Sequence, residues 1–598
     1  MIQAGRPAAV AETAFLGVEC SLTGRRWQAR ALDERLAMTL CQRLGLPEVV
    51  GRLLAARGIG LDAAESFLKP TLRDMLPDPA HLRGMDAAVA RLARAVRSGE
   101  SVCIFGDYDV DGATASALLR RFLDAVGGRV GVYIPDRVAE GYGPNTPALL
   151  RLKAEGVAVV VTVDCGISAF APLAAAAEAG LDVIVVDHHE AEPALPRAVA
   201  VVNPKRLDQE ESHPHLAAVG VAFLLAVALN RALRDAGWYR DRPAPDLMQW
   251  LDLVALGTVC DVVPLHGVNR ALVAQGLKVM ARRGNAGLAA LADVAGVRER
   301  LDAYHVGYIL GPRVNAGGRV GQADLGTRLL TTDDPAAALE MAQRLDDYNR
   351  ERQDIEAAVL LEAIEQVEGG ATASGALVVA AGDRWHPGVI GIVAGRLKER
   401  YNRPTVVIAF AGDEGRGSGR SVTGLDLGAA VIAACQAGLL VKGGGHAMAA
   451  GFTVERRRLD ELRAFLDERL AAQAAGLLVP SLELDGAVNL GGCTVDLVER
   501  IGNLGPFGAG NAEPRFAIAA ARVLRADVVG TGHVRCVLAG AAGSRLKAIA
   551  FRAADSQLGH ALLNAAGGAL HVAGCLRLDT WQGREGVQLF LEDAAPAR

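Results

Sequence analysis

The sequence predicts a large α/β protein that ends in a β-rich domain, and three patterns lead to that prediction. From Ser101, short β-branched runs alternate with helix-like segments, which is typical of βαβ units around a parallel sheet. A second, smaller unit of this kind begins near Ala376. After Ser481, short strand-like runs broken by glycine indicate a small β-barrel or sandwich. A chain of 598 residues has room for about three or four domains.

The same patterns divide the chain into segments in sequence order. In the first α/β unit the strands are SVCIFGDYD, VGVYIP, VAVVVTVDCG and LDVIVVDHH. The stretch from Asp334 to Glu368 predicts one or two long helices with a charged face, suited to connecting the two units. The predicted segments are an N-terminal helical segment (1–90), the first α/β domain (91–285), a helical linker region (286–370), the second α/β domain (371–475) and the β-rich domain (476–598).

The composition indicates a folded protein of the cytoplasm. With 51% hydrophobic and 22% charged residues, the chain is too apolar for a disordered protein. No run of about 18 apolar residues predicts a membrane span, and the N-terminus lacks the pattern of a secretory signal. The nine cysteines are scattered without a C-x-x-C pair, which favours a reduced protein. Because the net charge is −5, any nucleic-acid-binding surface must be local.

The segment GDYDVDG places three carboxylates, Asp107, Asp109 and Asp111, between a strand and a helix. This pattern also begins a calcium EF-hand loop, but such a loop needs a bidentate glutamate at the position of Leu118. Carboxylates this close repel one another unless a cation or basic groups neutralise them. Taken alone, the segment fits either a metal site or an Asp-rich turn.

Other acidic and histidine residues follow the next elements. Asp164 ends one strand, His188 and His189 end another, and Asp261 follows a helix. Each alone fits a helix cap or a turn. Since parallel strands bring their carboxyl ends to one edge, we expect Asp164 and His188 to meet Asp109 and Asp111 there. Carboxylates with one imidazole suit Mn²⁺ or Mg²⁺, and a bridging carboxylate can hold two ions for phosphoester cleavage.

The second α/β unit has the opposite charge bias. Between Arg384 and Arg458 there are eleven Lys or Arg and five Asp or Glu, whereas residues 100–270 contain 14 basic and 22 acidic residues. The glycine-rich segment GRGSGRS lets backbone amides approach an anion, and its arginines add bidentate contacts. We expect a loop that holds a terminal phosphate, with a flexible hairpin turn as the alternative. Its candidate residues are Arg416, Ser418, Arg420 and Ser421.

Three more motifs supply candidate DNA contacts. His446, in GGGHAMAAGF, is expected at a helix start, where it contacts phosphate or packs in a structural turn. Trp385 and His386 can stack on a base, although a lone Trp fits the core equally well. The candidates expected to follow the DNA backbone lie in GPRVNAGGR and are Arg313, Asn315 and Arg319.

Together and in this order, GDYDVDG, TVDCG, VDHHE and GTVCDVVPL are similar to motifs I to IV of the DHH phosphoesterase superfamily. Further motifs resemble those of its RecJ family, the bacterial single-strand-DNA-specific exonucleases: GPRVNAGGR, HPGVIGIVAGRL, GRGSGRS, GGGHAMAAGF and LGPFGAGN. The resemblance covers nearly all of the chain beyond about residue 60. It implies a DHH domain and a smaller DHHA1 domain joined by a long helix, followed by an OB-fold.

The resemblance also implies an activity and residue roles. The activity is 5′→3′ hydrolysis of single-stranded DNA to mononucleotides with two Mn²⁺ or Mg²⁺ ions, in recombination and repair. The enzyme is expected to be a monomer that works with a single-strand-binding protein and a helicase. Many superfamily members have a histidine where Phe105 stands, which makes Asp107 the substitute ligand. The implied metal ligands are Asp107, Asp109, Asp111, Asp164, His188 and Asp261. The implied catalytic residues are Asp109, Asp111, Asp164, His188 and His189, the last of which contacts the scissile phosphate or assists the leaving group.

Two other functions stay open on the sequence. Another phosphoesterase of the superfamily, acting on oligonucleotides or cyclic dinucleotides, would share the metal residues but is typically shorter. An inactive scaffold, like the replication-fork helicase subunit related to this family, need not keep the metal ligands, which are all present here. The roughly 120 residues after the second unit favour a long strand as the substrate.

Overall fold

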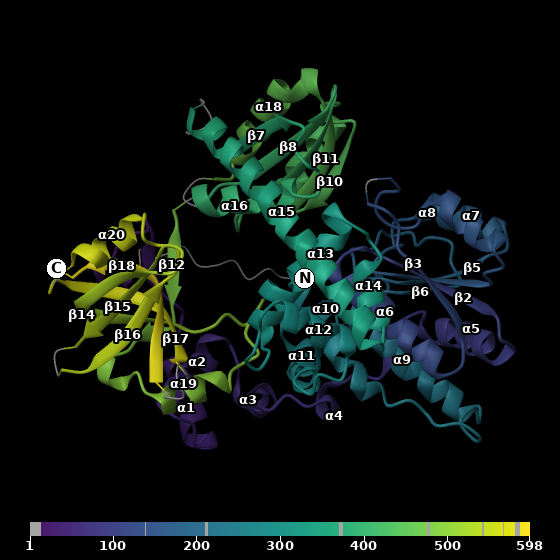
Figure 1. Ribbon diagram of the computed structural model, residues 1–598, viewed down its shortest axis with the longest axis horizontal. Coiled ribbons are helices and arrows are strands. Elements are labelled where there is room, and N and C mark those ends of the chain that lie inside the picture. Colours follow the sequence, from purple (N-terminus) through teal and green to yellow (C-terminus); the bar gives the residue numbers. More distant parts are fainter. Residues whose placement is uncertain are drawn as a thin grey trace.

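A five-stranded parallel sheet forms where apolar strands alternate with helices, as predicted. The computed structural model describes residues 13–597 apart from 138, 210–212, 370–374, 475–478, 541–542, 566 and 580–585. The sheet has the order β3-β2-β4-β5-β6 (Figure 1). Its strands are β2 (Ser101–Gly106), β3 (Arg129–Tyr133), β4 (Val159–Val163), β5 (Asp182–Val186) and β6 (Ala200–Val202). The helices of this domain are α5 (Met85–Ser98), α6 (Val110–Ala125), α7 (Thr146–Ala154), α8 (Phe170–Glu178), α9 (Ala218–Asp235), α10 (Leu251–Cys260) and α11 (Gly267–Met280).

Both faces of this sheet are covered, which explains why its strands are apolar throughout. Ile104 and Val161 belong to the cluster that includes α5, α6 and α9. Phe105 and Val160 belong to the cluster that includes α7 and α8. Neighbouring residues of one strand therefore pack on opposite faces, as the pleat requires.

A helical region connects the two lobes. The long helix predicted there is α15, whose 35 residues span about 52 Å. In Figure 1 it runs from the helices beside the first domain up to the second domain. The other helices of the region are α12 (Ala286–Val294), a π-helical turn (His305–Leu310), α13 (Gly311–Val320) and α14 (Leu325–Thr331), followed by α15 itself (Pro335–Gly369).

The second lobe is a five-stranded mixed sheet with the order β10-β11-β9-β8-β7. Only β7 and β8 are parallel, and the other neighbours are antiparallel. Its strands are β7 (Val378–Asp383), β8 (Thr405–Ala411), β9 (Glu414–Arg420), β10 (Lys442–His446) and β11 (Ala449–Glu455). Its helices are α16 (Ile390–Tyr401), α17 (Leu427–Gln436) and α18 (Leu459–Ala471).

The C-terminal domain is β-rich, as predicted. Five of its strands pair in a circle, β14-β15-β16-β18-β17 and back to β14, which suits the expected OB-fold. Its strands are β12 (Ser481–Leu484), β13 (Gly486–Ala487), β14 (Arg515–Val529), β15 (His533–Ala539), β16 (Arg545–Ala550), β17 (Ala569–Asp579) and β18 (Gly586–Pro596). Two helices, α19 (Val495–Gly502) and α20 (Gln557–Asn564), accompany them.

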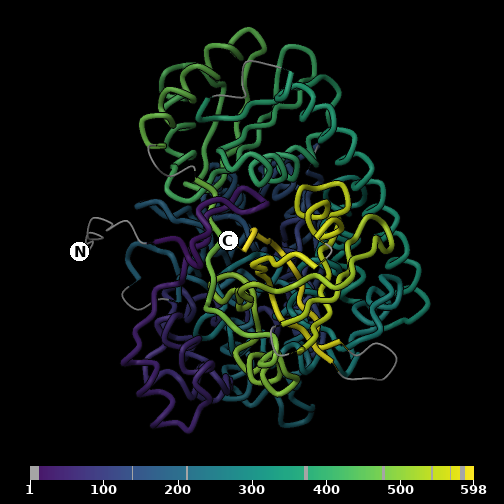
Figure 2. The backbone as a smooth tube through the Cα atoms, turned by 90° about the vertical axis from the view of Figure 1, so that its left-hand side faces the viewer, coloured from purple at the N-terminus to yellow at the C-terminus, as the bar shows by residue number. Residues whose placement is uncertain are grey.

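The N-terminal segment packs on this C-terminal domain. It contains β1 (Arg26–Ala29), α1 (Glu34–Leu44), α2 (Glu48–Ala56), α3 (Leu61–Leu68) and α4 (Leu72–Met75). The strand was not predicted, and it pairs in parallel with β12. Side chains of α1 to α3 share one hydrophobic cluster with the β-strands of the C-terminal domain. Figure 2 shows the purple N-terminal trace running beside the yellow-green C-terminal domain. The two ends of the chain therefore build one domain.

Trp27 anchors the N-terminal segment on the C-terminal domain. It is fully buried in β1, and its Nε1 donates to Asp593 of β18 at 2.9 Å. In the part of the chain that the structure describes, no helix combines the length and apolarity needed to cross a membrane.

We predict that Trp27→Ala lowers the free energy of unfolding of the C-terminal domain by about 3–5 kcal/mol, the usual cost of truncating a buried aromatic residue. Denaturant unfolding, with hydrogen exchange of the β17 and β18 amides, measures this. Met38→Ala, at a side chain 60% exposed on α1, is the control and should cost less than about 0.5 kcal/mol. Faster exchange confined to the first lobe would contradict the shared core.

Candidate metal centre and nucleic-acid interface

The acidic residues that we expected to converge lie at the carboxyl edge of the parallel sheet. The strand order places β2 beside β4 where the chain connections diverge, and open α/β sheets bind ligands at such switch points. Asp107 follows β2, Asp164 follows β4, and His188 lies two residues beyond β5. Three groups have ligand atoms within 4.8 Å of one another: Asp107 with Asp109 and Asp164, Asp111 with His188 and Asp261, and Asp164 with His188 and His189.

Hydrogen bonds fix the aspartates of the GDYDVDG turn. Asp109 caps α6, because its Oδ1 accepts the amide of Gly112 at 3.0 Å. Asp111 is 1% exposed, and its two oxygens accept the amides of Ala218 and Val219 at 2.6 and 2.9 Å. These amides begin α9, where the helix dipole favours a negative charge. A Cβ on Gly112 would lie 2.5 Å from the backbone oxygen of the first aspartate, so only glycine fits there.

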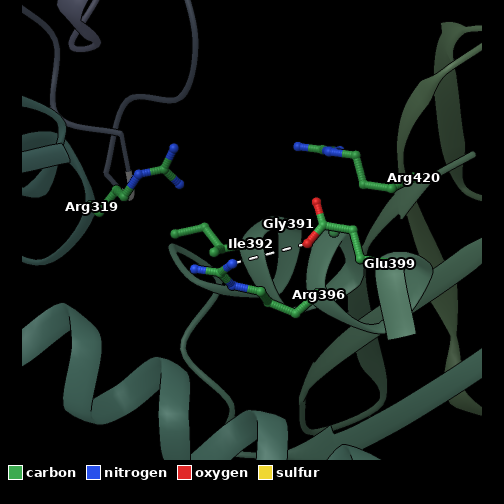
Figure 3. A pocket seen from close by; sticks show the side chains of 7 residues that line it. Arg319, Gly391, Ile392, Arg396, Glu399 and Arg420 are labelled. Carbon is green, nitrogen blue, oxygen red and sulfur yellow. Dashed lines mark ion pairs between the residues drawn. The ribbon is translucent and has the colours of Figure 1, made fainter. Parts of the chain in front are cut away.

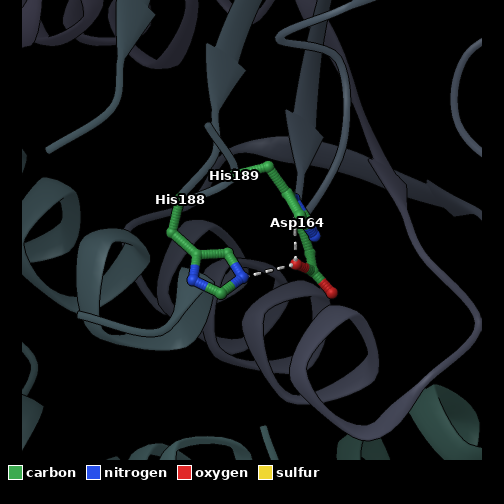
Figure 4. A group of neighbouring side chains, drawn as sticks. All are labelled: Asp164, His188 and His189. Carbon is green, nitrogen blue, oxygen red and sulfur yellow. Dashed lines mark ion pairs between the residues drawn. The ribbon is translucent and has the colours of Figure 1, made fainter. Parts of the chain in front are cut away.

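Asp187, to which the sequence assigned no role, holds the two histidines. Its Oδ1 accepts the amides of His188 and His189 at 2.7 and 3.1 Å, and the Nδ1 of His189 at 2.7 Å. The Nδ1 of His188 lies 3.1 Å from the backbone oxygen of Leu216, which makes it the protonated nitrogen. Its Nε2 therefore presents a lone pair 3.3 Å from Asp164 Oδ1 (Figure 4). Two acceptors at this distance repel unless a cation lies between them.

Burial and mutual repulsion raise the pKa of the clustered carboxyl groups. Burial, and then the charge of Asp109, raise the pKa of Asp111 to about 7. The same two causes hold the pKa values of Asp107 and Asp164 well above the usual range. The pKa of Asp261 rises to about 9 through burial and the charge of Asp111. The cluster therefore becomes fully ionised at neutral pH only with positive charge beside it.

Buried acceptor atoms in this region fit a divalent metal. Among the described residues, Asp107 Oδ1, His188 Nε2 and Asp261 Oδ2 have no hydrogen-bond partner. Burial, and then the charge of His189, lower the pKa of His188 to about 4, so its imidazole is neutral and able to ligate. A cation satisfies such acceptors, and oxygens with one imidazole match Mn²⁺ or Mg²⁺. The donor set therefore suits the predicted ions.

Phe105 lies in the core of the first domain and not at the metal site. It is fully buried, and its ring centroid lies 5.1 Å from that of Tyr133. Asp107, two residues further on, has its ligand atom grouped with those of Asp109 and Asp164. This geometry supports Asp107 as the substitute for the motif I histidine.

We had expected a loop at GRGSGRS, but residues 415–420 belong to strand β9 inside the second sheet, and Ser421 follows it. Its glycines stand where large side chains from the neighbouring elements cover one face of the strand. A Cβ on Gly417, for example, would lie 2.3 Å from the ring of Phe452. Because strand residues alternate between faces, Arg416, Ser418 and Arg420 project from the opposite face, which α16 approaches.

A cavity of about 300 Å³ lies between α13, α16 and β9. Arg319 of α13 and Arg420 of β9 point toward it from opposite sides (Figure 3). Arg396 and Glu399 line it from α16, with 4.0 Å between their nearest charged atoms. Gly391, in the first turn of α16, also lines it, and a helix N-terminus attracts anions. The cavity therefore suits an anion such as a phosphate.

Arg137, which the sequence analysis missed, adds positive charge near this cavity. Its guanidinium carbon lies 5.0 Å from the ring centroid of Tyr108. Burial, and then the charge of Arg137, lower the pKa values of Arg319 and Arg420. A lone arginine in an irregular loop gives no periodic signal that would have identified it.

Helix α13, formed by GPRVNAGGR, contacts both lobes. The Oδ1 of Asn315 accepts the first amide of α6, that of Val110, at 3.2 Å. Arg319 donates to a backbone oxygen of the turn before α16 at 2.9 Å. Arg313 pairs with Asp346 of α15 at 2.8 Å. Arg313 and Asn315, expected to follow the DNA backbone, are instead used inside the protein.

The other candidate residues have different surroundings. Trp385 is 5% exposed and its Nε1 donates to Glu362 at 2.7 Å, so it is a core residue and not a stacking platform. Ser421 is also buried and donates to a backbone oxygen at 2.7 Å. His446 lies at the end of strand β10 and not at a helix start, and it is exposed. His386 is half-buried, and its Nδ1 accepts a backbone amide at 3.1 Å.

The fold and the site together define a metal-dependent phosphoesterase of two lobes, one acidic and one with an arginine-lined cavity. Three domain models match the chain: the DHH family N-terminal domain over 101–258, the DHHA1 domain over 374–472 and the RecJ OB domain over 484–593. The single-stranded-DNA-specific exonuclease RecJ of Bacillus subtilis is 35% identical over 583 residues, which cover 95% of this chain and 71% of that protein. The RecJ of Escherichia coli is 37% identical over 518 residues, covering 84% and 88%. The chain belongs to the RecJ family.

Solved structures agree with this assignment. The crystal structure of RecJ in complex with Mn²⁺ from Thermus thermophilus has a TM-score of 0.79 and 30% identity, covering 95% of this chain and 79% of that one. The Mg²⁺ complex of the same protein gives a TM-score of 0.75 at 29% identity, covering 96% and 78%. Both ions are among those that the donor set described above fits.

We predict that Asp164→Asn weakens Mn²⁺ binding by at least tenfold, because even the loss of an outer partner of a metal site costs roughly 10–100-fold. Asparagine tolerates the left-handed backbone of this position, where φ is 60°, so the fold should persist. Titration calorimetry measures the change. The control is Asp235→Asn on the exposed side of α9, which should bind Mn²⁺ like the unmodified protein. Equal affinities for both variants would remove Asp164 from the metal site.

Proposed function

We propose that this protein is an exonuclease specific for single-stranded DNA, which removes mononucleotides in the 5′→3′ direction during DNA recombination and repair. One observation carries the proposal: α13 contacts the aspartate turn through Asn315 and the arginine-lined cavity through Arg319. These residues are four positions apart, about 6 Å along the helix axis. On this spacing, a 5′ phosphate in the cavity would lie about one nucleotide from the carboxylates. The relatives named as single-stranded-DNA-specific exonucleases support the substrate.

Two divalent cations, Mn²⁺ or Mg²⁺, complete the proposed site. When bound, such ions polarise a phosphoryl oxygen and lower the pKa of a bound water. Asp164 and His188 each belong to two of the three ligand groups, and Asp164, the carboxylate of the two, would be the residue shared between the ions. Hydrogen bonds from α6 and α9 hold the aspartates in place, so little rearrangement accompanies the reaction. The proposed ligands are Asp107, Asp109, Asp111, Asp164, His188 and Asp261.

His189 is the proposed proton donor. Its side chain is 42% exposed, whereas that of His188 is 7% exposed. Burial lowers the pKa of His189, but the hydrogen bond and charge of Asp187 outweigh it and raise the pKa above its usual value. Since Nδ1 is engaged with Asp187, Nε2 is left to donate to a phosphate oxygen or to the leaving oxygen. The hydroxyl of Tyr142 donates to the backbone oxygen of Asp164 at 2.9 Å and supports the same region.

The 5′ phosphate would be held by Arg319, Arg420 and Ser418. Arginine binds phosphate through two parallel hydrogen bonds, which fixes orientation as well as position. The exposed residues Arg416 and His446 would contact the strand outside the cavity. Trp385 and Ser421 are left out of this proposal because both are buried.

The two other functions considered from the sequence have less support. A short phosphodiesterase does not need the C-terminal domain, to which the RecJ OB domain model matches. A scaffold does not need buried, unpaired acceptors at the sheet edge. Action in the cytoplasm is supported by the nine cysteines, all of which are free. Cooperation with a single-strand-binding protein and a helicase, and the monomeric state, stay predictions from the family resemblance.

We predict strong preference for single strands over blunt duplexes, because separated bases must pass between the two lobes. Binding should weaken steeply with salt, since each phosphate contact releases counterions. Initial rates on end-labelled strands at several salt concentrations measure both effects. Equal rates on duplex and single strand would contradict passage between the lobes.

The arginine cavity generates a prediction about polarity. Arg420→Ala should cost roughly 1.5–3 kcal/mol of transition-state binding on a 5′-phosphorylated strand, the worth of a hydrogen bond to a charged group. The loss should be much smaller on a 5′-hydroxyl strand, which has no terminal phosphate to lose. Comparing kcat/KM for both proteins on the two strands measures the difference.

Arg416→Ala is the matched control, because Arg416 lies on the same strand and face but does not line the cavity. Its effect should be equal on the two strands. If Arg420→Ala also lowers kcat/KM equally on the 5′-phosphate and 5′-hydroxyl strands, Arg420 does not hold the terminal phosphate. Mononucleotides released first from a 3′ label would refute the polarity.

A further inference from the structure

Arg270 of α11 is a buried charge that the proposed chemistry does not use. Its exposed fraction is 0%. No carboxylate in the described ranges forms an ion pair with it, and burial, followed by the charge of Arg57, lowers its pKa to about 10. A buried guanidinium without a counter-charge is costly, so its hydrogen bonds must provide the compensation.

The guanidinium of Arg270 joins three parts of the chain that are remote in sequence. Its Nε donates to the backbone oxygen of Phe67, in α3 of the N-terminal segment, at 2.8 Å. The Phe67 ring centroid lies 3.7 Å from the guanidinium carbon. Nη2 donates to the backbone oxygens of Leu504 and Gly505 at 2.8 and 2.5 Å, and Nη1 to that of Pro506 at 3.4 Å. One side chain of the catalytic domain thus holds the N-terminal segment and the C-terminal domain together.

The turn that Arg270 holds is the motif LGPFGAGN, which the proposed function left without a role. Asn511 closes this turn, because its Nδ2 donates to the backbone oxygens of Leu504 and Pro506 at 2.8 and 2.9 Å. Its Oδ1 accepts Nε of Arg57 at 3.1 Å. The turn is therefore fixed from the N-terminal segment as well as from the catalytic domain.

The other side of the turn rests on the segment that leads from Asp261 to α11. The amide of Leu265 donates to the backbone oxygen of Ala509 at 2.8 Å. Gly510 has a φ of 72°, and a Cβ there would lie 2.6 Å from Nε2 of His266. The close approach and the positive φ both require glycine at this position. The C-terminal domain is thus seated four residues from a proposed metal ligand.

We propose that Arg270 is a positioning residue that seats the C-terminal domain on the catalytic domain, so that both bind one long single strand at the same time. This inference rests on the proposed function. A dinucleotide reaches only the two lobes, whereas a longer strand extends onto the C-terminal domain, since an OB-fold covers about 4–16 nucleotides. When two binding surfaces are held at a fixed distance, binding at the first raises the effective concentration of the strand at the second, and this gain in affinity is lost when the distance varies.

The test compares Arg270→Met with the unmodified protein on a 5′-phosphorylated dinucleotide and on a strand of about 20 nucleotides, longer than one OB-fold covers. We expect the KM for the long strand to rise about tenfold or more. Turnover of the dinucleotide should stay unchanged, because Arg270 contacts none of the proposed metal ligands. The control is Arg282→Met, at an exposed arginine just beyond α11, which should change neither value.

If Arg270→Met lowers kcat/KM equally on the dinucleotide and on the long strand, the proposal is overturned, since equal losses indicate a general effect on stability or on Asp261. An unchanged kcat/KM on both substrates would overturn the proposal as well. Equilibrium binding of the long strand, measured by fluorescence anisotropy in EDTA, gives a readout that does not depend on hydrolysis. If the unmodified protein hydrolyses neither strand, the proposed function fails, while this binding comparison still decides whether Arg270 acts as proposed.

A second variant covers the case in which Arg270→Met does not fold. Asn511→Asp keeps the oxygen that Arg57 uses but removes the amide donors that close the turn. The proposal predicts the same selective loss on the long strand. Unchanged binding of that strand by a folded Asn511→Asp variant would overturn it.

Discussion

The repulsion among buried carboxylates at the edge of the parallel sheet is the constraint on which the rest of the structure depends. Two unit charges 4 Å apart repel by about 4 kcal/mol at an effective dielectric constant of 20. The fold offsets part of this repulsion with backbone amides, those of α9 on Asp111 and those around Asp187. The remaining acceptors have no protein partner within the described residues. A protein that keeps such a cluster has given up stability at this edge in return for a strong affinity for cations.

Arginines from the first domain, α13 and the second lobe complement this acidic edge. Arg319 and Arg420 line one cavity, and neither forms an ion pair with a carboxylate among the described residues; Arg137 adds its charge nearby. A phosphodiester has a negative charge that suits both surroundings at once, because cations attract it on one side and guanidinium groups on the other. Helix α13 fixes the distance between them, since it is hydrogen-bonded to each lobe.

Much of the fold and the metal centre could be predicted from the sequence, because both follow from local pattern. The strand-end rule brought together Asp109, Asp111, Asp164 and His188 without knowledge of any contact. The sequence did not predict that GRGSGRS forms a strand. Its alternating glycines leave room for side chains such as that of Phe452, which come from elsewhere in the sheet and cannot be identified from the segment itself. Asn315 was assigned to DNA for a similar reason: its residue type suits a phosphate, but its partner is set by packing. The pairing of β1 with β12 gives no local signal at all.

The pairing of β1 with β12 has a consequence during translation. The N-terminal segment leaves the ribosome before the C-terminal domain, and the strands that complete its core are more than 400 residues further along the chain. At a synthesis rate of roughly 5–20 residues per second, this is a wait of about 20–80 s. Throughout that time Leu40, Leu53 and Leu54, all buried in the finished protein, lack their final cover. The nascent chain therefore offers a hydrophobic surface to chaperones from the emergence of α1 until that of the C-terminal domain.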